Sequence, residues 1–265
     1  MSTSGRYDHY DEDDVRVRPS RRGSRPRSKD RPRHEDAVDG RVIGVDRGRY
    51  HVMLDDDVTV TAVKSRNLGR GSIVVGDSVG LVGDVTGARD TMARLVRRNP
   101  RVSVLRRTAD DTDPVERVIV ANADQLVVVT ALAHPEPRPR LIDRCLVAAY
   151  DAGMSPLLCL TKADLADPET LLSTYRSLGV PWVVTQLNGP DAGDLTELRE
   201  RLAGRTSVLV GHSGVGKSTL VNALVPDAHR EVGHVNAVTG RGRHTSTSAY
   251  MLALPESGWI IDTPG

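Results

Sequence analysis

The sequence has no phenylalanine, and aromatic residues make up only 3% of its 265 residues. Aromatic side chains are the platforms on which proteins stack the splayed bases of single-stranded nucleic acid. Such platforms are scarce here. Any contact with RNA is therefore expected to depend on the phosphate backbone and on shape rather than on base sequence.

Cysteines and long apolar runs are also scarce. Cys145 and Cys159 have no cysteine or histidine at metal-ligand spacing, so we expect both to be buried thiols in a reducing compartment. No apolar run approaches the roughly 20 residues of a membrane span, and the N-terminus lacks the hydrophobic segment of a signal peptide. We therefore expect a cytoplasmic protein without a membrane partner, and we expect it to be a monomer.

Neither sign of charge predominates, since Lys and Arg number 36 and Asp and Glu number 35, for a net charge of +1. Attraction to nucleic acid must therefore come from local clusters. One cluster lies in residues 1–37, a stretch with few apolar residues that we predict to be a disordered basic tail. Its run VRVRPSRRGSRPRSKDRPR contains a single acid, Asp30. The tail either contacts phosphates or is a solvated arm without a fixed partner, and the sequence leaves both readings open.

Residues 38–108 change to short β-rich runs separated by Asp and Gly turns: RVIGV, YHVML, VTVTAV, SVGLVGDV and RVSVL. Short strands of this number and spacing predict a small OB-type β-barrel, a fold that commonly binds oligonucleotides. The basic residues of this region either form a surface for RNA or are scattered solubilising charges. They are Lys64, Arg66, Arg70, Arg94, Arg97, Arg98, Arg101, Arg106 and Arg107.

From residue 109 to residue 265, apolar strand-like runs alternate with helical patterns, which predicts a mostly parallel α/β sheet covered on both faces. Within this region, GHSGVGKST, residues 211–219, has a strand-like run before it and a helical run after it. This is the pattern of a phosphate-binding P-loop, in which backbone N–H groups surround the phosphates and a helix N-terminus adds positive potential.

The residues of this loop have predicted roles. Lys217 neutralises the terminal phosphates, and Ser218 supplies a hydroxyl to Mg²⁺. The others contribute mainly backbone groups: Gly211, His212, Ser213, Gly214, Val215, Gly216 and Thr219.

The string TKAD, residues 161–164, follows the apolar run SPLLCL. The Asp164 carboxylate can accept hydrogen bonds from guanine N1–H and N2–H, a donor pair that adenine does not present, and Lys162 can lie along the base. Alternatively, the string is an ordinary turn from strand to helix, with Asp164 as a helix cap. Beside a P-loop we favour a guanine site formed by Thr161, Lys162, Ala163 and Asp164.

The chain ends in WIIDTPG, where Asp262 is positioned to hold Mg²⁺ through water and the Gly265 amide to meet a γ-phosphate. Upstream, GRGRHTSTSAY offers hydroxyls at Thr245, Ser246 and Thr247 as metal ligands. The sequence does not decide between these hydroxyls. The alternative for the whole segment is a flexible basic loop.

Base recognition therefore precedes the P-loop in the chain, whereas other GTPases have the reverse order. A rotated order is physically permissible, because a sheet requires only that each strand lies beside its proper neighbour. We predict a circularly permuted P-loop GTPase domain in residues 109–265, preceded by the β-barrel.

A basic β-barrel followed by a GTPase domain in rotated order resembles the RsgA (YjeQ) family, circularly permuted GTPases that depend on the small ribosomal subunit. The resemblance covers residues 38–265 and is carried by ANADQLVVV, LIDRCLVAA, TKADL, GHSGVGKSTLVNAL, GRGRHTSTSAYM and DTPG. It implies binding of the small subunit and its rRNA, with hydrolysis of GTP to GDP and phosphate in late maturation of that subunit. It also implies that His244 acts in hydrolysis beside Lys217, although His244 is equally consistent with an exposed loop histidine.

Three features depart from the family pattern. The string VVTQL stands where the family has a Ser-Ala pair that backs the base, which leaves Thr185 as a poor candidate for that role. Thr161 stands where the family has an asparagine whose amide bridges to the P-loop, so we expect that link to be lost and the affinity for nucleotide to be lower. The family also continues past DTPG into a switch loop and a zinc-binding C-terminal domain. We therefore expect the sequence to be a fragment truncated after this motif, with GTP and Mg²⁺ as its cofactors and zinc needed only in the domain that it lacks.

Two other functions fit the same residues. An RNA-binding assembly module can use bound GTP structurally with negligible hydrolysis, and a P-loop ATPase or kinase would share the phosphate site. Loss of turnover in Lys217→Ala and loss of guanine preference in Asp164→Asn would separate a GTPase from these alternatives.

Overall fold

A computed structural model of the chain describes residues 34–68, 73–88, 90–110, 113–188, 193–226 and 249–263. The strands are β1 (Val38–Asp46), β2 (Arg49–Leu54), β3 (Thr59–Lys64), β4 (Ser78–Gly83), β5 (Ala93–Arg98), β6 (Val104–Asp110), β7 (Asp113–Ala121), β8 (Gln125–Ala131), β9 (Ser155–Thr161), β10 (Trp182–Val184), β11 (Thr206–Val210), β12 (Tyr250–Ala253) and β13 (Trp259–Asp262). The helices are α1 (Pro139–Asp151), α2 (Glu169–Tyr175), α3 (Thr196–Leu202) and α4 (Lys217–Leu224), with 3₁₀ turns η2 (Arg66–Leu68) and η3 (Arg176–Leu178).

One sheet runs through both the barrel and the α/β part of the chain, in the order β10-β9-β8-β11-β13-β12-β1-β2-β3-β5-β4. Strands β10, β9, β8, β11 and β13 pair in parallel, whereas β12 pairs antiparallel with β13 and with β1. β8 lies between β9, which leads into TKAD, and β11, which leads into the P-loop. This strand order confirms the predicted circularly permuted α/β architecture.

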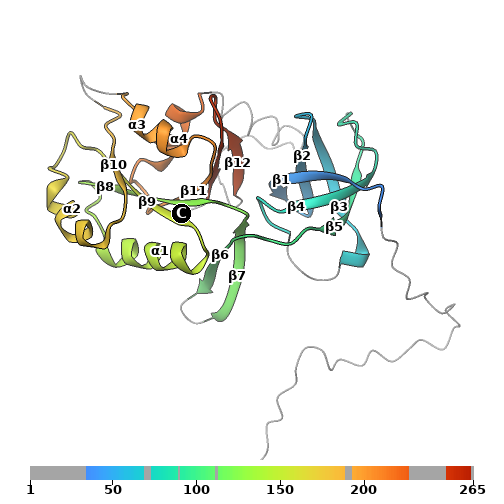
Figure 1. Cartoon of the computed structure of the whole chain (residues 1–265), viewed down its shortest axis with the longest axis horizontal. Helices are drawn as coiled ribbons and strands as arrows, with labels where there is room; N and C mark the ends of the chain where they lie inside the picture. Colours follow the sequence, from blue (N-terminus) through green and yellow to red (C-terminus); the bar gives the residue numbers. More distant parts are fainter. Residues whose placement is uncertain are drawn as a thin grey trace, which may run out of the picture. The chain divides into compact units, whose positions relative to one another are not determined.

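Helices cover both faces of the parallel strands (Figure 1). Side chains of α3 and α4, such as Leu198 and Leu220, pack on one face. Side chains of α1 and α2, such as Leu146 and Leu172, pack on the other. Every residue of β8 is buried, as expected for a strand covered on both faces. Among the described residues, no helix combines the length and apolar character that crossing a bilayer requires.

Strands β1 to β5 form a barrel, because β1 pairs with β2 and also with β4. Its core consists of aliphatic side chains that include Val42, Val52, Val60, Val79, Leu81 and Leu95. The predicted barrel is confirmed, but its last strand is β5 and not the run at residues 101–105. Arginines alternate with Ala93 and Leu95 in β5 and obscured its apolar pattern, whereas Val104 and Leu105 begin β6.

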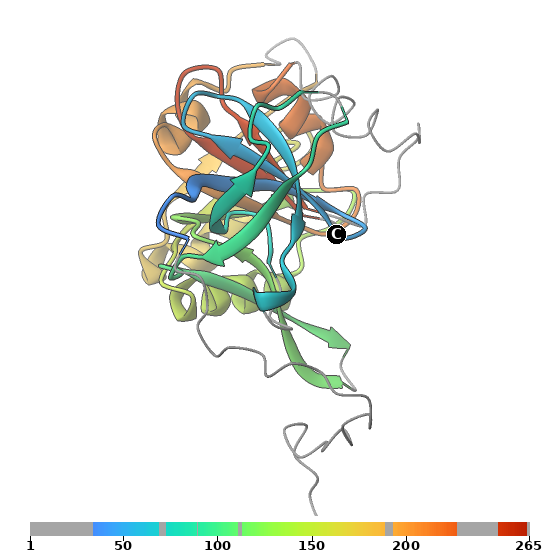
Figure 2. The ribbon, with the colours of Figure 1, turned by 90° about the vertical axis from the view of Figure 1, so that its right-hand side faces the viewer.

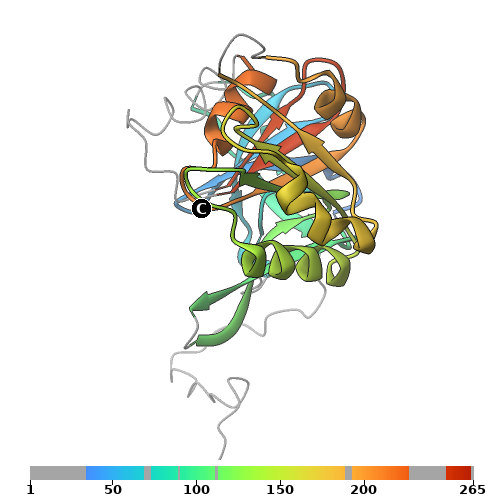
Figure 3. The same cartoon turned by 90° about the vertical axis from the view of Figure 1, so that its left-hand side faces the viewer.

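β6 and β7 form a separate two-stranded hairpin, which pairs Val104 with Ala121 at its base and Asp110 with Asp113 near its tip. Figures 2 and 3 show this hairpin projecting from the neighbouring strands. Its base is anchored by Leu105 and Val120, which are buried in a cluster with residues of β8, β11 and α1. β6 includes residue 108, at which we placed the predicted end of the barrel domain.

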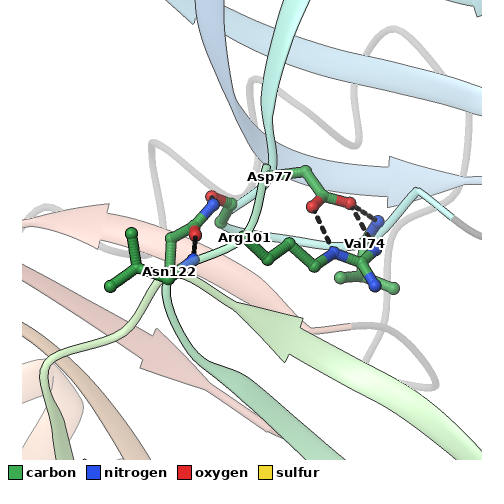
Figure 4. A network of polar contacts seen from close by, with 6 residues as sticks. Val74, Asp77, Arg101 and Asn122 are labelled. Carbon is green, nitrogen blue, oxygen red and sulfur yellow. Dashed lines mark hydrogen bonds and ion pairs between the residues drawn. The ribbon is translucent and has the colours of Figure 1, made fainter. Parts of the chain in front are cut away.

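A buried ion pair lies where the barrel meets the turn before β8 (Figure 4). The Asp77 carboxylate is inaccessible to solvent and accepts hydrogen bonds from Arg101 Nε at 2.7 Å and Arg101 Nη2 at 2.8 Å. It also accepts one from the Val74 N–H at 2.8 Å. Next to this pair, the Asn122 side chain donates to the Gly76 carbonyl at 2.9 Å. These bonds tie the segment before β4 to the turn between β7 and β8, and so join the barrel to the α/β part.

Removing the Asp77 carboxylate should destabilise the protein strongly. In Asp77→Ala, the Arg101 side chain, which is 11% exposed, would keep its charge and lose its bidentate partner. Breaking a buried pair from one side typically costs about 3–5 kcal/mol, and we expect a loss of that size in the free energy of unfolding measured with denaturant. Asp39→Ala is the matched control, because its pair with Arg97 at 2.8 Å is exposed and should contribute less than about 1 kcal/mol. Equal losses in the two variants would contradict a stabilising role for the buried pair.

Both cysteines are free thiols, with Cys159 buried and Cys145 half-buried. Burial raises the pKa of the Cys159 thiol to about 12, and it also raises the pKa of the Cys145 thiol. Since the thiolate is the reactive form, both side chains are expected to be unreactive at neutral pH.

Candidate nucleotide site

The predicted P-loop connects β11 to α4. Gly214 and Gly216 have φ angles of 82° and 94°, in the left-handed region that favours glycine. The loop also passes close to β8, since a Cβ at Gly211 would lie 2.6 Å from the Val129 carbonyl oxygen. α4 begins at Lys217, so the positive end of the helix adjoins the loop, as anion binding requires.

Lys217 and Asp262 meet at the end of β13. The Lys217 ammonium donates to Asp262 Oδ1 at 2.5 Å and to the Thr263 carbonyl at 2.5 Å. The register places Asp262 beside Leu209, close to the start of the P-loop, and the Thr263 hydroxyl donates to the Leu209 carbonyl at 2.9 Å. The lysine predicted for the phosphates and the aspartate predicted for the metal are therefore in direct contact.

The side chains at this point suit a magnesium ion. Asp262 offers a carboxylate, and Ser218, which is exposed in the first turn of α4, offers a hydroxyl next to Lys217. Oxygen donors of this kind, completed by waters and phosphate oxygens, are the usual surroundings of Mg²⁺. In the part of the chain that the structure describes, no group of three or more His, Cys, Asp or Glu side chains forms a metal site by itself. The donor set therefore fits a metal ion that is bound together with a nucleotide.

The TKAD segment is bonded directly to the P-loop. Thr161, which is 3% exposed at the end of β9, donates its hydroxyl to the Val215 carbonyl at 2.5 Å. The Lys162 ammonium donates to the Gly214 carbonyl at 2.9 Å and also to the His134 carbonyl. The expectation that threonine in place of asparagine removes the link to the P-loop is wrong, because the threonine hydroxyl forms that link itself.

Asp164 lies two residues beyond Lys162 and is exposed. A cavity of about 270 Å³ is lined by its neighbour Ala163, by Thr185 and Gln186, and by residues of β10 and α3. From the sequence, Thr185 was a poor candidate because VVTQL lacks the expected Ser-Ala pair, and Gln186 was not considered. Their position follows only from the parallel pairing of β10 with β9.

The loop after β8 is a second segment that the sequence does not mark. The carbonyl of His134 holds Lys162, and Pro135 Cδ would lie 3.6 Å from a Cβ at Gly214. A groove of about 1050 Å³ continues from this loop and the first half of the P-loop along α1. A backbone carbonyl that accepts a hydrogen bond leaves no trace in a sequence, so only the structure shows this contact.

The remaining predicted site residues fall into two groups. Ser213 and Thr219 are exposed, His212 is half-buried, and Val215 is buried in the core with α3 and α4. His244, Thr245, Ser246, Thr247 and Gly265 lie outside the described residues, and their roles stay predictions.

These elements define a class of protein. The parallel sheet carries a P-loop, and the TKAD segment comes before that loop in the chain. This is the fold of a circularly permuted P-loop GTPase. The family model for RsgA GTPase matches residues 98–265. The chain belongs to the RsgA GTPase family, which confirms the predicted membership.

Two curated relatives illustrate the similarity in sequence. The small ribosomal subunit biogenesis GTPase RsgA of Pseudomonas aeruginosa (strain LESB58) is 46% identical over 178 residues, which cover 64% of this chain and 51% of that protein. The protein of the same name from Ectopseudomonas mendocina (strain ymp) is 44% identical over 177 residues, or 64% of this chain and 50% of that protein. The chain spans about half the length of the curated relatives that it matches.

Two solved structures resemble the fold. YjeQ from Thermotoga maritima aligns with a TM-score of 0.63 and 28% identity, over 86% of this chain and 74% of that one. YloQ, described as a circularly permuted GTPase, aligns with a TM-score of 0.60 and 24% identity, over 89% of this chain and 74% of that one.

Proposed function

We propose that this chain binds GTP with Mg²⁺ and hydrolyses it to GDP and phosphate. The observation that carries the proposal is the direct bonding of the TKAD segment to the P-loop through Thr161 and Lys162. This bonding supports placing Asp164, the proposed base-reading residue, and Lys217, the proposed phosphate residue, on one nucleotide.

Guanine would be recognised at the end of β9. In this proposal, the Asp164 carboxylate accepts hydrogen bonds from guanine N1–H and N2–H, and Lys162 lies along the base. Ala163 lines the cavity beside them, which gives the base a recess next to the loop. Thr161 does not read the base but holds the end of β9 against the P-loop.

The phosphates would lie against the backbone N–H groups of residues 211–219, with Lys217 as their counter-charge. Ser218, Asp262 and one hydroxyl of Thr245 or Ser246 would hold Mg²⁺, which when bound neutralises charge on the phosphate oxygens. Asp262 and Thr263 already hold the Lys217 ammonium beside the P-loop, within reach of a phosphate bound there. Gly265 is proposed to donate its amide to the γ-phosphate, and His244 to orient the attacking water.

We further propose the small ribosomal subunit and its rRNA as partners, in late maturation of that subunit in the cytoplasm. The names of the curated relatives, small ribosomal subunit biogenesis GTPases, support this choice. In the proposed division of labour, the tail (residues 1–37) and the barrel (residues 38–108) contact RNA, and residues 109–265 bind GTP.

The basic residues of the barrel differ in whether their side chains are available to bind RNA or are paired with acidic side chains of the protein. Arg66, Arg94 and Arg98 are exposed at or just after the paired strands β3 and β5, where their charge can attract phosphates. Arg97 and Arg101 instead form ion pairs with Asp39 and Asp77. These two members of the predicted basic set contribute to the fold.

Stimulation of hydrolysis by ribosomal subunits tests the proposal. Purified small subunits should accelerate phosphate release from GTP by orders of magnitude, as expected where part of the charge stabilisation is supplied in trans. Large subunits are the matched control and should have no effect. A variant with Arg66, Arg94 and Arg98 changed to alanine should keep the basal rate and lose much of the stimulation.

The alternative function, an RNA-binding module that uses bound GTP structurally, predicts a different result. Such a module would bind GTP and small subunits without turnover above background in any mixture. Equal stimulation by both subunits would contradict the proposed partner and leave the proposed hydrolysis intact.

A further inference from the structure

A row of paired residues connects the barrel to the proposed metal site. His51 of β2 pairs with Gly44 of β1, Gly44 pairs with Tyr250 of β12, and Tyr250 pairs with Asp262 of β13. Side chains at directly paired positions of neighbouring strands lie on the same face and contact one another. The row therefore places a barrel histidine, a tyrosine and the proposed metal aspartate on one face of the sheet.

The rings of His51 and Tyr250 both lie against Gly44, which has no side chain of its own. A Cβ at Gly44 would lie 3.3 Å from Tyr250 Cδ1 and 3.6 Å from His51 Cδ2. His51 is 3% exposed, and its Nε2 has no hydrogen-bond partner among the described residues. Burial lowers the pKa of His51, an effect that the nearby Asp46 carboxylate opposes, and burial together with Asp46 raises the pKa of Tyr250. The Tyr250 ring therefore packs directly against Gly44 of the barrel.

On its other side, Tyr250 adjoins the residue that holds Lys217. Directly paired residues of antiparallel strands have Cβ atoms about 5 Å apart. A displaced Tyr250 side chain at the start of β12 would therefore press on the side chain of Asp262. Asp262 Oδ1 lies 2.5 Å from the Lys217 ammonium. Tyr250 and the carboxylate that holds Lys217 are therefore neighbours on adjacent strands.

We propose that Tyr250, seated over Gly44, is a positioning residue that fixes the Asp262 carboxylate for Mg²⁺, so that the packing of the barrel sets the metal affinity of the nucleotide site. This inference rests on the proposed binding of GTP with Mg²⁺. It assigns a role in that binding to two residues, Gly44 and Tyr250, that lie outside the P-loop and the TKAD segment.

Gly44→Ala tests the proposal, because the added methyl group presses on the Tyr250 ring at 3.3 Å. The probe is a fluorescent, non-hydrolysable GTP analogue titrated with Mg²⁺. The Mg²⁺ concentration that gives half of the metal-dependent gain in binding should rise about 5- to 10-fold, the lower part of the range for coupled sites. Binding of the analogue without Mg²⁺ should change less, since the Thr263 carbonyl also holds the Lys217 ammonium.

Gly80→Ala is the matched control. Gly80 is a buried glycine of β4 in the same barrel, and its Cβ would meet Ala37 Cβ at 3.2 Å and Arg97 Cβ at 3.3 Å. The steric load is similar, but Gly80 pairs with Asp39 and Arg97 and is not in the row that contains Asp262. It should leave the Mg²⁺ requirement at the parent value, and equal shifts in the two variants would overturn the proposal.

Two substitutions of Tyr250 provide the second measurement. Tyr250→Phe keeps the ring and should retain the parent Mg²⁺ requirement, whereas Tyr250→Leu should raise it. Adding Gly44→Ala to Tyr250→Leu should have little further effect, because the ring that the methyl group displaces is already gone. Additive effects would overturn the proposal.

Two outcomes separate this inference from the proposed function. If the parent chain shows no metal-dependent binding of the analogue, the proposed function itself fails. If the parent chain shows such binding and Gly44→Ala has the same Mg²⁺ requirement as the parent, only this inference fails.

Discussion

Lys217→Ala should lower kcat for GTP hydrolysis by roughly 10²- to 10³-fold, the loss typical of removing one preorganised group that stabilises charge in the transition state. The ammonium is already held at the end of β13 by Asp262 and Thr263, so little reorganisation is needed for it to meet a phosphate. Phosphate release in single turnovers at saturating Mg²⁺ and GTP measures the effect. The Asp262 side chain is 30% exposed and stays hydrated without its partner, so the melting temperature should change little.

Arg199→Ala is the control for this experiment. It also removes a cation that bonds to α4, but at the far end of the helix, where Arg199 Nη2 donates to the Ala223 carbonyl at 3.0 Å. Turnover should stay at the parent value. A Lys217→Ala variant that hydrolyses GTP at the parent rate would exclude the proposed role of the P-loop lysine and favour a module that only binds the nucleotide.

Asp164→Asn should lower the affinity for GTP by roughly 10²- to 10⁴-fold, because two hydrogen bonds to a charged acceptor are each worth about 1.5–3 kcal/mol. The substituted amide presents a donor where the carboxylate presents only acceptors, so it opposes one of the two guanine N–H groups. Xanthine has a carbonyl where guanine has its amino group, and the variant should therefore prefer XTP to GTP. Competition titrations with GTP, XTP and ATP measure the order of affinities.

Asp167→Asn is the matched control, since Asp167 is exposed in the same loop and its carboxylate accepts a hydrogen bond from the Glu169 N–H at 2.9 Å. It should keep the preference for GTP. A parent chain that binds ATP as tightly as GTP would contradict base reading by Asp164 and favour the ATPase or kinase alternative.

The sequence predicted those features that depend on local strings. TKAD, the P-loop and Asp262 each follow an apolar strand, and their order in the chain was sufficient to predict the permuted fold. Lys217 was assigned to the phosphates and Asp262 to the metal, and the structure brings these two residues together.

Features that depend on register could not be predicted. The Thr161 hydroxyl can donate a hydrogen bond to the Val215 carbonyl because β9 and β11 lie on either side of β8. A backbone carbonyl that accepts a hydrogen bond has no signature in the sequence. β5 was missed because its arginines interrupt the apolar pattern. Arg97 and Arg101 were counted among basic residues that either form a surface for RNA or are scattered solubilising charges. Their ion pairs could not be predicted, because the pairing that brings Asp39 and Asp77 to them spans distant parts of the chain.

The continuity of the sheet from β12 into β1 means that the barrel is not a detachable module. Ile43 and Val45 of β1 pack against the cluster that contains Met251 and Ile261, so excision would expose apolar side chains together with a strand edge. Exposed edges of this kind recruit other chains. RNA-binding measurements on an isolated barrel would therefore include non-specific association through apolar side chains and a strand edge that the intact chain keeps covered.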